Sequence, residues 1–198
     1  MANHKIAIVV GSLRTGSINR KVALSMSSIA RDKLDCSIVE IGDLPLFNQD
    51  LEASPPPEWV RFREQISAAD GVLFVTPEYN RTIPGGLKNA IDVGSRPYGQ
   101  SVWERKPAAI VTASPGGIGG FGANHNLRQA CVFLDMPVMQ QPEAYLGHVT
   151  DQSFNDVGSL MEGPLKELIE RVAGAFAGWI DVIQSGRASL ARDSAHNS

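Results

Sequence analysis

Short apolar runs alternate with longer segments of helical periodicity along this chain, and this alternation limits its possible folds more than any other feature. The expected strands lie at residues 5–10, 35–41, 71–76, 108–112, and 138–140 with a continuation at 143–146. The expected helices lie at residues 20–32, 58–69, 85–93, 123–134 and 158–184. Strands that alternate with helices build a parallel sheet covered on both faces. The sequence therefore predicts one three-layer α/β/α domain over residues 1–184.

The pattern within the runs indicates the order of the strands. Residues 71–76 are apolar almost throughout, as expected of a central strand that is buried on both faces. Residues 35–41 alternate between apolar and polar side chains, as expected of an edge strand. We therefore expect a flavodoxin-like, doubly wound, five-stranded parallel sheet in the order 2-1-3-4-5, whose ligand crevice lies at the carboxyl ends of strands one and three.

The last residues, 185–198, are polar and lack periodicity, so a disordered tail is expected there. The net charge of −3 argues against nucleic acid as a partner, because nucleic-acid-binding domains usually carry a basic excess. No apolar run reaches the roughly 18 residues of a membrane span. The first residues lead directly into a strand and leave no room for a signal peptide, so a cytoplasmic location is expected.

The two cysteines, Cys36 and Cys131, lie far apart in the sequence and have neither CxxC nor metal-ligand spacing. Apolar neighbours surround Cys131 at 130–133, which favours a buried structural thiol. We expect neither a cysteine nucleophile nor a metal site.

The loop after the first strand, GSLRTGSINR at 11–20, has the composition of an anion site. Backbone N–H groups at the start of a helix attract anions, and Ser12, Ser17 and Asn19 can hydrogen-bond to oxygen. Arg14 adds a planar cation that suits phosphate. We interpret the loop as the phosphate site of a nucleotide-like cofactor. The alternative is an ordinary strand-to-helix turn capped by Ser17 or Asn19.

Two further unusual loops follow the third and fourth strands, and the fold places all three at one edge of the sheet. The loop at 77–84 offers a rigid turn, an aromatic face and an amide. The glycine-rich loop at 114–120 lets backbone approach a flat ring closely. A phosphate cradle beside such a slot suits flavin mononucleotide, FMN. Each of these two loops also has a plainer interpretation. Tyr79 can be read as a half-buried aromatic, and Glu78 as a solvated side chain or a cap on the helix near Gly85. The glycine-rich loop can be read as an ordinary flexible turn.

Three motifs resemble the NADPH-dependent FMN reductase family, in particular its soluble quinone and chromate reductases: GSLRTGSINR at 11–20, TPEYNRTIPGGLKNAID at 76–92, and an LRQ…FLDMPVM…PE pattern at 127–143. The resemblance runs from about residue 6 to residue 146. It implies that Ser12, Arg14, Ser17, Ile18 and Asn19 bind FMN around its phosphate. It also implies that the isoalloxazine ring and ribityl chain are lined by Pro77, Glu78, Tyr79, Asn80, Ser114, Gly116 and Gly117.

The resemblance also implies the reaction. NADPH or NADH would reduce FMN by hydride transfer, and the flavin would then reduce a quinone or similar acceptor, chromate and azo compounds included, in a ping-pong cycle. The cofactor carries this chemistry, so no catalytic side chain is expected, and His125 and His148 are interpreted as structural. A cation for the NADPH 2′-phosphate could be Arg81, Arg20, or Arg96 from a second copy of the chain; we assign Arg81.

Three alternatives remain open at this point. A flavodoxin-like electron carrier would share the site without oxidising NAD(P)H, although carriers are usually more acidic. A flavin reductase that releases reduced FMN would use the same residues. A hydrolase or phosphatase would need a nucleophile in the phosphate loop, and 11–20 contains no cysteine. The resemblance also implies a homodimer or homotetramer, with the flavin near a subunit boundary.

Overall fold

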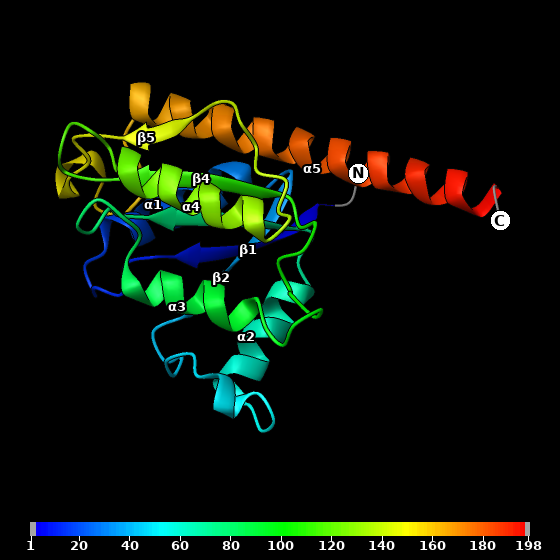
Figure 1. Ribbon diagram of the computed structural model, residues 1–198. Coiled ribbons are helices and arrows are strands. Elements are labelled where there is room, and N and C mark those ends of the chain that lie inside the picture. The colour runs from blue at the N-terminus through cyan, green and yellow to red at the C-terminus, as the bar shows by residue number, and fades with distance from the viewer. Residues whose placement is uncertain (1–2, 197–198) are drawn as a thin grey trace.

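Five strands pair side by side in the order β2-β1-β3-β4-β5 in the computed structural model, which describes residues 3–196. All four pairings are parallel, so the strands end at one edge of the sheet, on the left in Figure 1. The predicted flavodoxin-like fold and its strand order are confirmed. The strand bounds are β1 His4–Val10, β2 Leu34–Val39, β3 Gly71–Thr76, β4 Ala108–Ala113 and β5 Ala144–Leu146.

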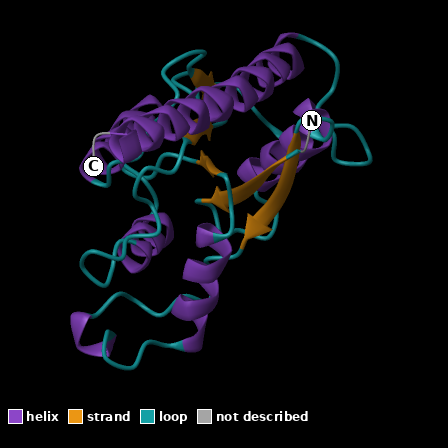
Figure 2. Ribbon diagram, turned by 90° about the vertical axis from the view of Figure 1, so that its right-hand side faces the viewer, coloured by secondary structure: helices purple, strands orange, loops and turns teal. Residues whose placement is uncertain are grey.

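Helices cover both faces of the sheet (Figures 1 and 2). One layer holds α1 (Ile18–Ala30) and α5 (Pro164–His196), whose buried side chains join one core cluster. The other layer holds α2 (Pro57–Ser67), α3 (Gly85–Gly94) and α4 (Phe121–Phe133), which form the second cluster. Short 3₁₀ helices lie at Gln49–Leu51 and Asp151–Ser153.

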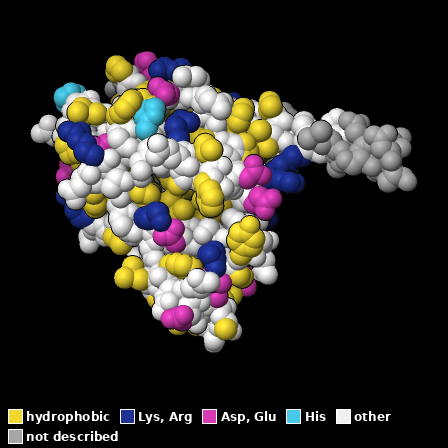
Figure 3. Space-filling model, in the orientation of Figure 1, with side chains coloured by type: hydrophobic (Ala, Val, Ile, Leu, Met, Phe, Trp, Pro, Cys, Tyr) yellow, Lys and Arg dark blue, Asp and Glu magenta, His cyan; other side chains and the backbone are white. Residues whose placement is uncertain are grey.

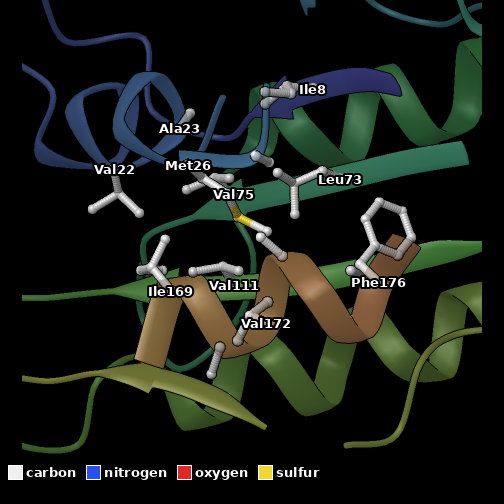
Figure 4. Close-up of a cluster of buried hydrophobic side chains, with 14 of the residues drawn as sticks. Ile8, Val22, Ala23, Met26, Leu73, Val75, Val111, Ile169, Val172 and Phe176 are labelled. Carbon is white, nitrogen blue, oxygen red and sulfur yellow. The ribbon is translucent and has the colours of Figure 1, made fainter. Parts of the chain in front are cut away.

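The α1–α5 layer is held to the sheet by closely packed apolar side chains (Figure 4). Met26 of α1 and Phe176 of α5 are both fully buried, and they face Leu73 and Val75 of the central strand. The apolar residues of α1 recur at helical spacing, so one side of this helix is buried while Leu24 stays exposed. This packing fixes where α1 begins, and therefore where the loop before it lies.

The last helix differs from its expected bounds at both ends. It begins at Pro164 rather than residue 158, because the two preceding glycines, Gly158 and Gly163, have positive φ and Pro164 suits a first helical turn. It then continues to His196, through most of the segment for which disorder was expected. No proline interrupts 185–196, and several of its residues are good helix formers. Residues 197–198 of the expected tail lie outside the described residues.

The fifth strand is shorter than expected. Val138 makes only an isolated bridge to Ala108, and β5 proper pairs with β4 over three residues. Among the described residues, no helix is both long enough and apolar enough to cross a membrane.

Both cysteines are free thiols. Burial raises the pKa of Cys131 to about 12 and, with the nearby Asp35 carboxylate as a second cause, that of Cys36 to about 11. The expectation of a buried structural thiol at Cys131 is confirmed, because such a thiol is almost entirely protonated at neutral pH.

Candidate functional site

The loop between β1 and α1 presents a row of backbone N–H groups that have no protein acceptor. Within the described residues, Gly11 N–H donates to Val75 O at 2.9 Å, whereas none of the N–H groups from Ser12 to Asn19 donates to a protein atom. Ser17 is the N-cap of α1, and its hydroxyl accepts from Arg20 N–H at 3.1 Å. The loop is therefore both the capped turn and, through its free N–H groups, a candidate anion site at a positive helix end.

The side chains of this loop divide between the surface and the interior. Arg14 is exposed, and its guanidinium donates to Gly16 O at 2.7 Å, which curls it over the loop. Ser12 is half-buried beside it. Ile18 packs against the α1–α5 core, so only its backbone faces the loop. Of the predicted ligands here, Ser12 and Arg14 thus offer side chains to the loop surface, and Ile18 does not.

Asn19 is buried and joins the first loop to the end of β4. Its Nδ2 donates to Ala113 O at 3.2 Å, while its Oδ1 is buried without a hydrogen-bond partner in the structure. A buried amide oxygen without a donor is costly, so it needs a partner that the protein itself does not supply. A hydroxyl of a bound ligand is such a donor.

The loop after β3 forms a tight two-residue turn. Tyr79 N–H donates to Thr82 O at 2.9 Å and Thr82 N–H donates to Tyr79 O at 3.0 Å, while Asn80 and Arg81 have φ of 52° and 67°. Two consecutive positive φ values are the signature of a type I′ turn, which favours asparagine or glycine and strains arginine. Strained backbone of this kind concentrates at binding sites. Tyr79 and Asn80 are exposed at its tip, and Pro77 is half-buried.

Glu78 points away from that tip and into the protein. Its Oε2 accepts from Ala123 N–H of α4 at 3.1 Å, and its Oε1 lies 3.2 Å from Arg81 Nη1. It therefore caps α4, and the suggestion that it caps the helix near Gly85 is wrong, because Pro84 stands at the start of α3. Only the backbone of Glu78 remains free to line a ligand.

The glycine-rich loop after β4 lies against the end of β5. Ser114 N–H donates to Leu146 O at 2.9 Å, and the Ser114 hydroxyl accepts from Gly116 N–H at 3.0 Å. A Cβ at Gly119 would stand 2.6 Å from the Tyr145 backbone, so this loop needs glycine to pass so close. Gly116 and Gly117 are exposed next to it. The three loops thus meet at the carboxyl edge of the central strands, as the sequence predicted.

A cluster that sequence reasoning missed flanks the glycine loop. Phe121 and His125 of α4 lie 4.2 Å apart between ring centroids, and His125 Nε2 is 3.0 Å from the Tyr145 hydroxyl. Burial and the nearby Glu143 raise the pKa of Tyr145 to about 12. In Figure 3 histidine side chains lie beside hydrophobic ones at the left, toward which the strands point. The only sequence signal was the position of Tyr145 directly before the end of the fifth strand.

The three arginines considered for the NADPH 2′-phosphate differ in exposure and in how firmly other side chains hold them. Arg20 makes two hydrogen bonds to the Glu40 carboxylate, at 2.7 and 3.2 Å. Arg96 lies 2.9 Å from Glu52 Oε1 in a hollow of about 540 Å³ on the outer side of α2 and α3, which none of the three loops lines. Arg81 is exposed over three quarters of its side chain and touches Glu78 only at one nitrogen. Arg81 is therefore the most accessible of the three, at the site itself.

Volume alone does not locate this site. The hollow on the outer side of α2 and α3 is the larger, whereas a hollow of about 450 Å³ lies beside the first loop, between Ser12, Arg14 and Gly42. Unpaired N–H groups and an unpartnered buried amide oxygen are stronger signs of a ligand than the volume of a hollow, because they show which hydrogen-bonding groups a ligand would have to supply. We place the candidate site at the three loops on that ground.

The chain is similar to known proteins over most of its length. A model of the NADPH-dependent FMN reductase family matches residues 4–151. A quinone reductase of Pseudomonas putida is 58% identical over 178 residues, which cover 89% of this chain and 95% of that one. A 2-hydroxy-1,4-benzoquinone reductase of a Burkholderia species is 44% identical over 177 residues, covering 89% and 96%.

A solved structure is similar over nearly the whole fold. The flavoenzyme NAD(P)H:(acceptor) oxidoreductase from Paracoccus denitrificans superposes with a TM-score of 0.86 at 38% identity, covering 90% of this chain and 97% of that one. The sequence motifs, the sheet order and the three converging loops agree with these matches. The chain belongs to the NADPH-dependent FMN reductase family.

Proposed function

We propose that this protein is an NAD(P)H-dependent FMN oxidoreductase that reduces quinones. The observation that carries the proposal is the row of unpaired N–H groups from Ser12 to Asn19, next to the orphaned Oδ1 of Asn19, at the meeting point of the three loops. These groups fit FMN: a phosphate accepts from the N–H groups, and a ribityl hydroxyl can donate to Asn19.

The named residues divide the cofactor between them. The phosphate would be held by Ser12, Arg14 and the backbone around Ile18. Ser17 would donate its hydroxyl proton to the phosphate, since its oxygen already accepts from Arg20 N–H. The turn at Pro77–Asn80 and the loop with Ser114, Gly116 and Gly117 would border the ring. Backbone N–H groups near the ring would stabilise negative charge on the reduced flavin.

Bound FMN would supply the hydride chemistry, first accepting from NADPH or NADH and then donating to the acceptor. The protein's own part is to hold the ring with one face open, so that donor and acceptor occupy the same place in turn. Arg81 is assigned to the 2′-phosphate of NADPH because it is exposed at the rim of the site. No side chain is assigned as acid, base or nucleophile.

Quinones are the proposed acceptors because relatives that span almost the whole chain are named for quinone reduction. An open flavin face is poorly selective, so chromate and azo compounds are proposed as further acceptors. The protein is also proposed to work in the cytoplasm, where NAD(P)H is abundant. A homodimer or homotetramer with the flavin near the subunit boundary is also proposed. The exposed Val132 and Phe133 at the C-terminal end of α4 support a contact between copies, and sedimentation would test the assembly.

The experiment is to purify the protein, measure its FMN content, and follow NADPH oxidation with 1,4-benzoquinone and no other protein. Steady oxidation with about one retained FMN per chain supports the proposal. FMN retention without NADPH oxidation identifies an electron carrier instead. Oxidation that requires added free FMN, and that saturates with it, identifies a flavin reductase.

A further inference from the structure

The turn that carries Arg81 is fastened to the start of α4 by two side chains. Glu78 Oε2 accepts from Ala123 N–H at 3.1 Å, and the Thr82 hydroxyl donates to Asn126 Oδ1 at 2.7 Å. These contacts join residues 45 and 44 positions apart in the sequence. The turn between Glu78 and Thr82 is therefore held as one unit with α4 rather than hanging free from β3.

The Glu78 carboxylate is divided between two partners of different kinds. One oxygen caps the positive end of α4, and the other lies 3.2 Å from Arg81 Nη1. Glu78 has an exposed side-chain fraction of 12%, against 76% for Arg81. The carboxylate is thus fixed in place, while the guanidinium is free to turn toward solvent or a ligand.

Gly122 of α4 leaves the space that the Glu78 carboxylate and the Arg81 backbone occupy. A Cβ there would stand 2.8 Å from Glu78 Oε2 and 3.0 Å from Arg81 O. Both the carboxylate and the backbone of the turn therefore need a glycine on α4. No other acidic side chain lies within ion-pair distance of Arg81 among the described residues.

We propose that Glu78 is a positioning residue that weakens NADPH selectivity by competing with the 2′-phosphate for Arg81. The inference rests on the proposed function, in which Arg81 receives that phosphate. A 2′-phosphate dianion and the Glu78 carboxylate would flank one guanidinium and repel each other. NADH carries no 2′-phosphate, so Glu78 leaves its binding nearly unaffected.

The size of the effect follows from charges in a solvated site. Two anions on either side of a guanidinium are roughly 6 Å apart, which in salt-screened water corresponds to about a three- to tenfold change in affinity. The exposed ion pair that must be broken adds little, because such pairs are weak.

The test is Glu78→Gln in the FMN-loaded protein, which keeps an oxygen for Ala123 N–H and removes the charge. We expect kcat/KM for NADPH, divided by that for NADH, to rise about three- to tenfold. Calorimetry with adenosine 2′,5′-bisphosphate and with AMP gives a readout besides activity: the bisphosphate alone should bind more tightly to the variant.

Two variants separate charge competition from a general loosening of the turn. Thr82→Val removes the other contact with α4, which is uncharged. It should change kcat/KM for NADPH and for NADH by the same factor. In an Arg81→Ala background, Glu78→Gln should no longer alter the ratio, because the shared partner is gone. Glu78→Asp keeps the negative charge, so its NADPH/NADH ratio should rise less than that of Glu78→Gln.

An unchanged or lower NADPH/NADH ratio in Glu78→Gln, with FMN retained and both nucleotides oxidised, overturns the inference and leaves the proposed function standing. A ratio that rises equally in the Arg81→Ala background also overturns it. Absence of NAD(P)H oxidation by the parent protein instead refutes the proposed function.

Discussion

At the scale of single residues, Asn19 has the clearest double role. Its amide nitrogen donates to Ala113 O across 94 residues of sequence, and its amide oxygen is buried without a partner among the described residues. The first contact stabilises the fold whether or not a ligand is bound, and the second is available to a ligand.

Asn19→Ala is expected to destabilise the flavin-free protein by about 1 kcal/mol, because the loss of the buried donor to Ala113 O is only partly offset by removal of the unpartnered Oδ1. FMN affinity should fall as well. Urea unfolding and fluorescence titration with FMN measure the two effects. Gln65→Ala, at an exposed amide side chain on α2, serves as the control and should stay within about 0.5 kcal/mol of the parent in unfolding. Equal losses of stability in the two variants would contradict the assignment.

Arg81 combines a functional assignment with a strained backbone, since its φ is 67°. Arg81→Ala is expected to raise KM for NADPH more than KM for NADH. Arg81→Gly should raise KM for NADPH similarly while being more stable than the alanine variant by about 1 kcal/mol, because glycine tolerates positive φ. Steady-state kinetics with both nucleotides and thermal unfolding test this; equal KM changes for NADPH and NADH would discard the assignment.

At the scale of elements, the glycines of the loop before α4 differ in whether the backbone conformation requires them. Gly120 has φ of 81°, and a Cβ there would stand 2.8 Å from Thr112 Cβ. Gly116 has no such constraint, since its nearest contact would be an ordinary 3.5 Å. Gly120→Ala should therefore lower the free energy of unfolding by about 1–3 kcal/mol, and Gly116→Ala by less than about 0.5. Urea unfolding of the two flavin-free variants measures both losses, and equal losses would contradict the prediction.

The packing of α1 sets the position of the phosphate loop. Met26 is fully buried against the sheet and α5, whereas Leu24 on the same helix is half exposed. Met26→Ala should cost about 2–5 kcal/mol and Leu24→Ala much less, because only the first opens a cavity. Chemical denaturation gives both values. Similar costs for the two variants would mean that α1 packs in another orientation.

At the scale of the whole molecule, the buried thiol predicts how stability depends on pH. The pKa of Cys131 is about 12 in the folded protein and lower when the chain unfolds. Because the folded pKa is raised, this contribution to stability is complete below about pH 8.5 and is lost as pH rises toward 12. The loss at pH 10 is about 2 kcal/mol.

Urea midpoints from pH 8 to pH 10.5 check the prediction, with Cys131→Ala as the comparison. The alanine variant is less stable at pH 8 but should show a flatter decline with pH. A decline as steep as that of the parent protein would place the titrating group elsewhere.

Much of the fold could be predicted because its signals are local. Gly71–Thr76 is a strand in the structure over the residues expected, and its apolar composition correctly indicated a central place in the sheet. The end of α5 could not be predicted in the same way, because residues 185–196 show no apolar periodicity in the sequence. Its polar residues are nevertheless compatible with a helix that continues from a packed one.

The sequence by itself determined the order of the elements, the three converging loops and the family. The reason is that apolar periodicity, turn residues and motifs each depend on residues that are close together in the sequence. Only the tertiary structure decided the hydrogen-bond partners: the Glu78 carboxylate accepts from the α4 backbone, the Asn19 amide donates to Ala113 O, and the Tyr145 hydroxyl lies beside His125. The physical reason is that hydrogen bonds between residues 20 to 94 positions apart depend on how layers pack. No local pattern encodes which of several polar side chains reaches a given distant N–H or carbonyl group.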